Sequence, residues 1–238
     1  MNDNFLEVSG ATLTGIDVFS DLNGKERNEV AKQCRGHRFD SGQLIVSHLD
    51  NTNEVFFIIS GTVRVTIYSK AGKETTFRDV SAGQMFGELS AIDSKPRSAH
   101  VIALVPSSVL FVSANRFWEL LEKYPSIAKR TLQYLTKLVR LLSDRVVEIN
   151  TLGVKNRIHA ELLRLGRNQE KSDEIVTITP IPTHADLANR IGTHREAVTR
   201  ELGVLARQGV VSKKDNKLII QDMERLQRMV DDVLNDEF

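Results

Sequence analysis

The longest stretch of unbroken helical periodicity in the chain runs from about Ser126 to about Leu152 and contains neither glycine nor proline. Apolar residues recur along it every three or four positions, which places them on one face of an α-helix. Such a helix is roughly 40 Å long, which is more than one small domain can cover. It therefore predicts two folded regions, 1–125 and 153–238, joined by a helix at 126–152. The apolar face comprises Leu135, Leu138, Leu142, Val146 and Ile149.

An apolar face of this length needs a partner that removes it from water. Two copies of the chain would bury it against each other as a parallel coiled coil, so the segment predicts a homodimer. The alternative is a helix that packs only on its own N-terminal domain. Lys137, Arg140 and Asp144 lie off the apolar face, as expected for positions that stay in solvent.

Residues 38–112 carry short runs of branched and aromatic residues, which favour β-strands. Many short strands with a glycine at each corner are typical of a roll closed on itself. We therefore expect an α+β chain whose N-terminal domain is a jelly-roll-like β-roll. A helical lead-in at 1–35 precedes the strands, and a short helix around Phe117–Leu121 follows them. The strand runs are Leu44–Val46, Val55–Ile59, Val63–Tyr68 and Val109–Val112.

The segment 86–99 combines the residue types that hold a small phosphate. Gly83 and Gly87 allow backbone turns that other residues resist, and a short helix is expected to begin there. The unpaired N–H groups of a first helical turn attract an anion. The Arg97 guanidinium can bind a phosphate through two parallel hydrogen bonds, and Ser98 adds a hydroxyl donor.

A carboxylate in the same segment indicates a sugar. Glu88 would repel a phosphate directly, but it can accept a hydrogen bond from a sugar hydroxyl. The segment therefore predicts a site for the ribose phosphate of a cyclic nucleotide, whereas the strands alone indicate only an all-β binding domain of unspecified ligand. The expected ligand-binding residues are Gly87, Glu88, Leu89, Ser90, Arg97, Ser98 and Ala99.

In the C-terminal region a polar loop is expected at 168–172, followed by a strand at 175–179 that Pro180 ends. Two helical patterns separated by a glycine come next. Thr183 is a favourable N-cap for the first helix, and Gly192 permits a tight turn after it. Thr193 is expected to cap the second helix. This spacing is that of a helix-turn-helix, in which the second helix enters the major groove of DNA.

The exposed face of the second helix suits base edges. Arginine pairs with guanine and glutamate accepts from the amine of cytosine, so Arg195, Glu196 and Arg200 favour direct base contacts. Six Lys or Arg against two acids between residues 189 and 214 give a local charge of +4, although the net charge of the chain is only +1. A basic wing turn is expected at 213–217 and would contact phosphates. The predicted DNA-binding residues are Thr193, His194, Arg195, Glu196, Thr199, Arg200, Lys213 and Lys214.

The composition disfavours several other classes of protein. The single cysteine, Cys34, cannot form an intramolecular disulfide or build a thiolate-held cluster within one chain, which fits a reducing cytoplasm. The histidines are scattered, so we expect no metal and no metal-dependent enzyme such as a phosphodiesterase. The N-terminus lacks the pattern of a signal peptide, and the most apolar region, 101–112, is too short to span a bilayer. We expect a cytoplasmic protein with no membrane partner.

The segment 86–99 resembles the phosphate-binding cassette of cyclic-nucleotide-binding domains, and the whole chain is similar to the cyclic AMP receptor branch of the CRP/FNR family of bacterial regulators. The resemblance implies a dimeric, allosteric transcription factor that binds cyclic AMP, with RNA polymerase as a partner. It also implies that Arg195, Glu196 and Arg200 recognise a TGTGA-like palindrome. The oxygen-sensing mechanism of the FNR branch needs several cysteines and does not carry over.

The resemblance leaves the choice of base open. The adenine contacts of the family come from two successive hydroxyl residues on the long helix, and the corresponding positions here are Leu142 and Ser143. Only Ser143 keeps a hydroxyl, and Ser98 would also serve the amine of guanine. We therefore expect cyclic AMP as the ligand, with cyclic GMP as the alternative.

Two hypotheses for the function remain. In the first, a cyclic nucleotide in the roll shifts a hinge at Gly153 so that the recognition helices of a dimer lie one DNA turn apart. In the second, the roll is a dimerisation and partner-docking scaffold, and DNA binding needs no ligand. The presence of Gly87, Glu88, Arg97 and Ser98 together favours the first hypothesis.

Overall fold

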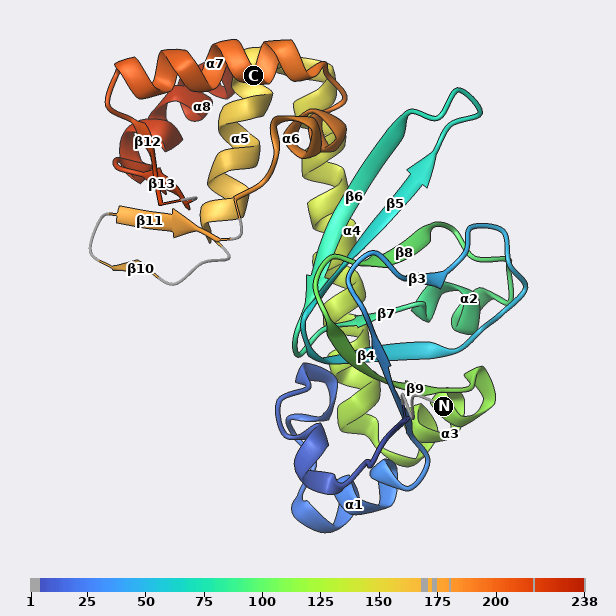
Figure 1. The fold of residues 1–238 in the computed structure, drawn as a ribbon. Helices are drawn as coiled ribbons and strands as arrows, with labels where there is room; N and C mark the ends of the chain where they lie inside the picture. Colours follow the sequence, from blue (N-terminus) through green and yellow to red (C-terminus); the bar gives the residue numbers. More distant parts are fainter. Residues whose placement is uncertain (1–4, 168–170, 173–174, 180, 216, 238) are drawn as a thin grey trace. The chain divides into compact units, whose positions relative to one another are not determined.

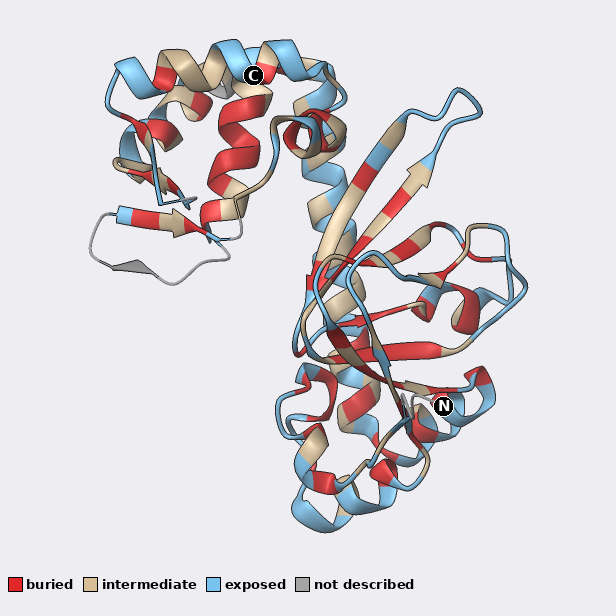
Figure 2. Cartoon of the chain, in the orientation of Figure 1, coloured by how far each residue is buried: buried red, intermediate tan, exposed pale blue. Residues whose placement is uncertain are grey.

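The computed structural model describes residues 5–167, 171–172, 175–179, 181–215 and 217–237. The chain divides into two compact units, residues 1–138 and residues 139–238 (Figure 1). Each unit has its own hydrophobic interior, which is seen as the buried segments of Figure 2. The long helix contributes residues to both units.

Within the described residues, the N-terminal unit is built on two antiparallel sheets. Its strands are β1 (Phe5–Leu6), β2 (Arg35–Phe39), β3 (Leu44–Val46), β4 (Val55–Ser60), β5 (Thr62–Tyr68), β6 (Glu74–Ser81), β7 (Met85–Phe86), β8 (His100–Ala103) and β9 (Ser107–Val112). One sheet has the order β1-β2-β9-β4-β7 and the other has the order β3-β8-β5-β6. Strands far apart in sequence are neighbours in both sheets, which is the arrangement of a roll and confirms that prediction.

Short helices accompany the roll (Figure 1). The 3-10 helices η1 (Gly10–Leu13) and η2 (Asp17–Phe19) and the helix α1 (Gly24–Ala31) precede β2. The helix α2 (Glu88–Asp93) follows β7, and α3 (Ala114–Lys123) follows β9. The helical lead-in predicted for residues 1–35 is therefore wrong in part, since it consists of short turns and one helix and contains β1.

Aromatic rings fill the interior of the roll on both sides of β4. The ring of Phe57 is fully buried, and its centroid lies 4.8 Å from that of Phe19. The neighbouring Phe56 faces the other way and stacks on Phe86 at 4.8 Å. Because both faces of β4 are buried, its sequence is a continuous apolar run rather than an alternating one.

The predicted strand runs are confirmed as β3, β4, β5 and β9. The sequence analysis does not predict β2, β6 and β8: β2 and β6 are rich in charged and polar residues, and β8 has only four residues. These strands form because β9 and β5 offer unpaired backbone groups beside them: β2 pairs with β9, and both β6 and β8 pair with β5.

The long helix is confirmed as α4 (Pro125–Thr151), which has 27 residues. Pro125 occupies its first position, where a missing N–H costs no intrahelical hydrogen bond. In the N-terminal unit, Ile127 is fully buried in the core. The part of α4 from Val139 onward belongs to the C-terminal unit.

Five exposed apolar residues of α4 form rows that repeat every seven positions, and Val147, which is 39% exposed, lies outside both rows. Leu132, Val139 and Val146 form one row, and Leu142 and Ile149 form a second. All five are at least 40% exposed. The predicted stripe omits the first two of these residues, which a strict seven-residue repeat would have found.

The C-terminal unit packs helices on a small antiparallel sheet (Figure 1). Its further elements are α5 (Val154–Arg167), β10 (Lys171–Ser172), β11 (Ile175–Ile178), α6 (His184–Ile191), α7 (Arg195–Arg207), β12 (Val211–Lys214), β13 (Lys217–Ile220) and α8 (Met223–Glu237). The strand order is β10-β11-β13-β12. Together with α6 and α7, the β12–β13 hairpin makes a winged helix-turn-helix, as predicted.

Two boundaries in this unit differ from the predictions or fall outside the structure. The polar loop predicted at 168–172 is wrong at its end, because β10 pairs with β11. Residues 168–170 of that loop lie outside the described residues. Pro180, which is predicted to end the strand observed as β11, also lies outside the described residues.

Replacing Phe57 by alanine should lower the free energy of unfolding of the N-terminal unit by about 3–5 kcal/mol, because it empties a fully buried site between β4 and η2. Urea unfolding followed by the fluorescence of Trp118 measures this effect, since the chain has one tryptophan and it lies on α3. Leu162→Ala, in the core of the C-terminal unit, is the control. Equal shifts of the Trp118 transition in both variants would contradict separate cores.

Candidate functional site

The segment 86–99 forms a turn followed by the short helix α2. Gly87 has φ 82°, in the left-handed region, and is the N-cap of α2. A Cβ at this position would lie 2.8 Å from both Arg97 Nη1 and the carbonyl oxygen of Glu54. Glycine is therefore needed here for its backbone conformation and for the close approach of its neighbours.

The Arg97 side chain is only 2% exposed and contacts several separate segments. Its Nε donates to Thr52 Oγ1 at 2.9 Å, and its Nη1 donates to the Gly87 carbonyl oxygen at 2.9 Å. Its Nη2 donates to Glu54 Oε2 at 3.1 Å. The guanidinium also lies 5.7 Å from the ring centroid of Phe56. These contacts fix a positive charge at the start of α2.

Glu88, the first residue of α2, is 2% exposed. Burial raises the pKa of its carboxyl group, and the charges of Arg78 and Arg97 oppose that rise. Burial likewise lowers the pKa of Arg97, while Glu54 opposes the change. A buried carboxylate beside guanidinium groups can accept a hydrogen bond from a ligand hydroxyl with little competition from water.

The other predicted residues of this segment divide by exposure. Ser90 and Ala99 are buried, so they shape the turn and the base of the site. Leu89 is 45% exposed, and Ser98 is exposed as well. The Ser98 hydroxyl, next in sequence to the buried Arg97, is accessible to a ligand.

The sequence pattern does not single out two residues that connect the strands β6 and β7 with α4. Tyr134 Oη donates to the Met85 carbonyl oxygen at 2.5 Å, and Arg78 Nη2 donates to Tyr134 Oη. The Arg78 guanidinium also lies 5.4 Å from the Tyr134 ring centroid. These bonds connect β6 and β7 with the long helix, and the positive charge of Arg78 also lowers the pKa of the Glu88 carboxyl group against the effect of burial. An isolated arginine on a strand carries no sequence signal for such a role.

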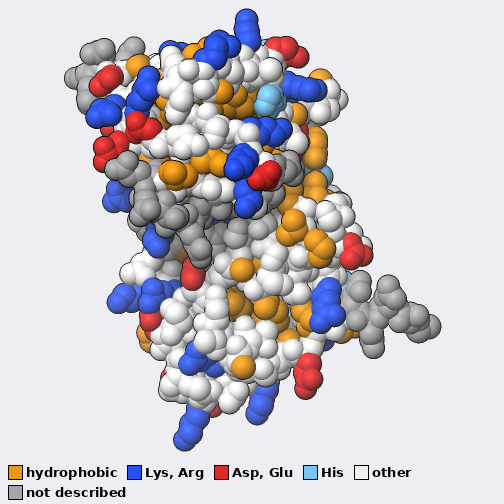
Figure 3. All heavy atoms as spheres, turned by 60° about the vertical axis from the view of Figure 1, so that its left-hand side comes forward, with side chains coloured by type: hydrophobic (Ala, Val, Ile, Leu, Met, Phe, Trp, Pro, Cys, Tyr) orange, Lys and Arg blue, Asp and Glu red, His pale blue; other side chains and the backbone are white. Residues whose placement is uncertain are grey.

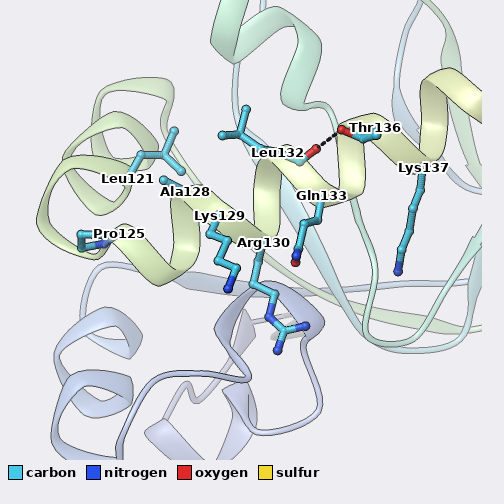
Figure 4. Close-up of a pocket in the computed structure, with 9 residues that line it drawn as sticks. All are labelled: Leu121, Pro125, Ala128, Lys129, Arg130, Leu132, Gln133, Thr136 and Lys137. Carbon is cyan, nitrogen blue, oxygen red and sulfur yellow. Dashed lines mark hydrogen bonds between the residues drawn. The ribbon is translucent and has the colours of Figure 1, made fainter.

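A separate groove of about 840 Å³ runs along α4 (Figure 4). In this groove Arg130 points toward the N-terminal segment, where it pairs with Asp21 at 2.6 Å. The groove follows the face of α4 that carries the exposed Leu132, and the predicted nucleotide contacts do not line it. Its lining residues are Leu121, Pro125, Ala128, Lys129, Arg130, Leu132, Gln133, Thr136 and Lys137.

Leu142 and Ser143 lie on the part of α4 that belongs to the C-terminal unit. Both residues are exposed, which leaves them accessible to a ligand or to a second copy of the chain. Their contact with a nucleotide base stays a prediction.

The first helix of the helix-turn-helix begins as the sequence predicts. Thr183 Oγ1 accepts a hydrogen bond from the Asp186 N–H at 3.0 Å, and Asp186 Oδ2 accepts one from the Thr183 N–H at 3.0 Å. This reciprocal pair is a capping box that ends the chain's extended segment and starts α6. Gly192, with φ 67°, caps the other end.

The predicted cap of the second helix is wrong by one residue. The N-cap of α7 is His194, and its side chain makes no capping hydrogen bond. Thr193 instead belongs to the turn, because its backbone N–H donates to the Ala188 carbonyl oxygen at 3.0 Å and completes the end of α6.

The predicted base-contacting side chains lie on the solvent face of α7. Arg195, Glu196, Thr199 and Arg200 are all exposed or half-buried, and His194 before them is exposed. The opposite face carries apolar residues that are fully buried in the core of the unit, namely Val198 and Leu205.

His184 is a further residue at this surface, which the sequence analysis did not assign. Its Nδ1 lies 2.7 Å from Thr199 Oγ1. Its pKa is lowered by burial and by the nearby charges of Arg195 and Lys213. Groups from α6, α7 and β12 therefore converge on one basic surface.

The wing is partly strand. Lys213 and Lys214 are exposed on β12 and pair with Leu218 and Lys217 of β13. The predicted turn at 213–217 is therefore shorter than expected, and its Asn216 lies outside the described residues. Figure 3 shows Lys and Arg side chains at several places on the surface of the C-terminal unit.

Within the described residues, His, Cys, Asp and Glu side chains do not gather in groups of three or more that would hold a metal ion. Among the same residues, each helix is too short or too polar to cross a membrane.

Comparison with known proteins assigns a domain type to each unit of the chain. A model of the cyclic nucleotide-binding domain matches residues 37–124, and a model of the Crp-like helix-turn-helix domain matches residues 156–229. The cassette and the helix-turn-helix thus define a cyclic-nucleotide-binding, DNA-binding regulator of transcription. The chain belongs to the CRP/FNR family.

Relatives of known role align over most of the chain. A CRP-like cAMP-activated global transcriptional regulator of Mycobacterium tuberculosis is 26% identical, and the match covers 91% of this chain and 97% of that one. The cAMP-activated global transcriptional regulator CRP of Salmonella typhimurium is 24% identical over 79% of this chain and 90% of that one. The solved structure of a CRP/FNR-family regulator from Thermus thermophilus is 26% identical, with a TM-score of 0.65 over 82% of this chain and 98% of that one.

We expect Gly87→Ala to weaken nucleotide binding by about tenfold or more, because it adds a clash with Arg97 to the strain of a positive φ, which costs about 1–3 kcal/mol. Gly72→Ala is the matched control, since Gly72 has φ +76° and open space around its Cβ position. The fluorescence of Trp118 reports binding, because its indole donates to the Ala91 carbonyl oxygen of α2 at 3.0 Å. Equal nucleotide affinity in the two variants would refute the steric role of Gly87.

Proposed function

We propose that this regulator is a homodimer in which cyclic AMP, bound at the segment 86–99, favours the conformation that binds a TGTGA-like palindrome. The observation that carries the proposal is the buried Arg97 guanidinium at the start of α2, beside the buried Glu88 carboxylate. A cyclic nucleotide presents one phosphate and one ribose hydroxyl at a fixed separation. The Arg97 guanidinium can donate hydrogen bonds to the phosphate, and the Glu88 carboxylate can accept one from the hydroxyl.

Ligand binding at this site competes with contacts that Arg97 already makes. Of its five N–H groups, three donate to Thr52, the Gly87 carbonyl oxygen and Glu54, so a phosphate bound through two N–H groups competes with these acceptors for the guanidinium. Glu54 is the one repelled by the phosphate charge, and at 37% exposure its side chain can turn to solvent. The loop between β3 and β4 would then change its contacts with α2, which supplies a local response to the nucleotide.

Cyclic AMP is proposed as the ligand because two relatives are named as cAMP-activated regulators. Cyclic GMP is the alternative, because Leu142 stands where the family has a hydroxyl residue and leaves only Ser143 to contact the base. A member that binds DNA without a ligand is the second candidate. The close approach of the Arg97 side chain to Gly87, and the burial of Glu88 and Arg97, favour a nucleotide-binding site over that candidate.

The proposed DNA contacts follow from the solvent face of α7. Arg195 and Arg200 would bind guanine, and Glu196 would accept from cytosine, while Lys213 and Lys214 would contact phosphates. Nucleotide binding would place the two α7 helices of a dimer one DNA turn apart, and by reciprocity operator DNA would tighten nucleotide binding.

The proposed dimer forms through α4. Its exposed rows of Leu, Val and Ile repeat every seven residues, and a seven-residue apolar repeat is buried by a second helix of the same kind. We further propose a cytoplasmic location, where operator DNA and RNA polymerase are present.

Fluorescence anisotropy of a labelled duplex with a TGTGA-type palindrome tests this function. We expect tight binding with cyclic AMP, weaker binding with cyclic GMP and the weakest binding without nucleotide. The salt concentration is held fixed because contacts to the DNA backbone give a nonspecific affinity that depends on salt. Arg97→Leu should abolish the effect of the nucleotide. Equal binding of the wild type in all conditions would favour the ligand-independent alternative.

Arg200→Ala should relax specificity at one base pair of each half-site, at a cost of about 1–3 kcal/mol of binding free energy. Lys213→Ala should instead weaken specific and random DNA alike and reduce the salt dependence, because it removes a phosphate contact. Anisotropy titrations on both kinds of duplex separate the two effects. Equal losses on specific and random DNA for Arg200→Ala would exclude its role in base recognition.

A further inference from the structure

A buried set of charged side chains joins the end of α4 to the DNA-binding helices within the C-terminal unit. Glu161 of α5 stands at its centre and is only 1% exposed. The guanidinium groups around it come from three different helices. We name this set the hinge cluster, and it comprises Arg145, Glu148, Glu161, Arg164 and Arg190.

Each ion pair of the hinge cluster connects a defined pair of elements. Arg145 Nη2 of α4 lies 3.4 Å from Glu161 Oε2, and Arg190 Nη1 of α6 lies 3.4 Å from Glu161 Oε1. Arg164 pairs with Glu161 on its own helix α5, and its Nη2 also reaches Glu148 Oε1 of α4 at 2.5 Å. One carboxylate therefore holds the end of α4 and the first helix of the helix-turn-helix at the same time.

The helix that carries Glu161 also contacts the recognition helix. His159, two residues earlier on α5 and fully buried, has its Nε2 at 2.7 Å from Glu201 Oε1 of α7. Figure 2 shows that α5 is buried along much of its length. Because α5 follows α4 after only Leu152 and Gly153, it is the element through which the orientation of α4 sets that of α6 and α7.

The physical character of these contacts suits a positioning role. Buried ion pairs add little net stability because each charge loses its hydration, but they are strict in geometry, since a misplaced charge is left unpaired in a dry environment. The side chains of Arg145 and Arg190 are 12% and 5% exposed, so water cannot replace Glu161 as their partner without rearrangement. Apolar packing alone would tolerate a small rotation of α6 against α4, whereas this cluster does not.

We propose that Glu161 is a positioning residue for operator binding, which fixes the angle between the end of α4 and the helix-turn-helix through its pairs with Arg145 and Arg190. This inference rests on the proposed dimer that binds a palindrome. In such a dimer, the two recognition helices engage their half-sites together only when that angle is correct. Affinity gained from simultaneous engagement is lost when the geometry forbids it, although each domain still binds alone.

The test compares a palindrome with a duplex that holds one half-site, by anisotropy at fixed salt with and without cyclic AMP. Glu161→Gln keeps the shape of the side chain and removes its charge. Glu224→Gln, at an exposed position on α8, is the matched control, because it changes the net charge equally and so corrects for the electrostatic effect on DNA affinity. Nucleotide affinity, measured by Trp118 fluorescence, reports whether the roll is intact.

We expect Glu161→Gln to lower the affinity for the palindrome by about tenfold or more relative to Glu224→Gln, while the affinity for the half-site changes by less than about twofold. The affinity for the nucleotide in the roll should stay the same. Similar ratios of palindrome to half-site affinity in the two variants would overturn the proposal, as would an equal loss on both duplexes.

Arg145→Gln provides a second route if Glu161→Gln does not fold, because it removes only the α4 partner of Glu161. It should lower the same ratio by itself, and an unchanged ratio would overturn the proposal. When Glu161→Gln folds, the losses of the two single variants should be less than additive in the double variant Arg145→Gln/Glu161→Gln. Full additivity would overturn the proposal. If the wild type binds the palindrome equally with and without cyclic AMP, the proposed response to the nucleotide is refuted. The ratio of palindrome to half-site affinity can still be compared between the variants, so failure of the proposed function and failure of this inference are distinguishable.

Discussion

The nucleotide site depends on the burial of one positive charge. Arg97 is almost completely removed from solvent, so its guanidinium must find hydrogen-bond acceptors within the protein. It finds them on the loop before β4 and at the turn before α2, and this requirement brings those segments together. The same requirement makes Gly87 necessary, since a larger residue would occupy the place of the guanidinium. A ligand phosphate is also a hydrogen-bond acceptor, so under the proposed function the same buried arginine would serve both the fold and nucleotide binding.

The C-terminal unit uses the same principle with the signs reversed. There a buried carboxylate, Glu161, organises guanidinium groups from α4 and α6. In both units a charge on one element is satisfied only by elements distant in sequence, so small displacements of those elements carry a free-energy cost. Interactions of this kind favour a few discrete arrangements over a continuum, which is what the proposed response to a nucleotide requires.

Much of the fold and of the site was predictable, for reasons that lie in local chemistry. The continuous apolar run of β4, the glycine and proline that bound the helices, and the Thr183 cap are properties of neighbouring residues. The charged strands β2 and β6 were not predictable, because they form on edges that other strands provide. Thr193 was misassigned as a cap because its N–H completes α6, and neither Arg78 nor Tyr134 has a local pattern that reveals their contact.

The sequence by itself determined the two kinds of domain, the long helix between them, and the residues expected to contact the phosphate and the bases. These features depend on periodicity and on residue types close together in the chain, which a linear pattern records. Only the tertiary structure decided which partners hold Arg97, which residues connect β6 and β7 to α4, and that Glu161 joins three helices. Such pairings depend on burial and on distances between segments far apart in the chain, and a buried charge is identified only when the surrounding segments are seen to exclude water.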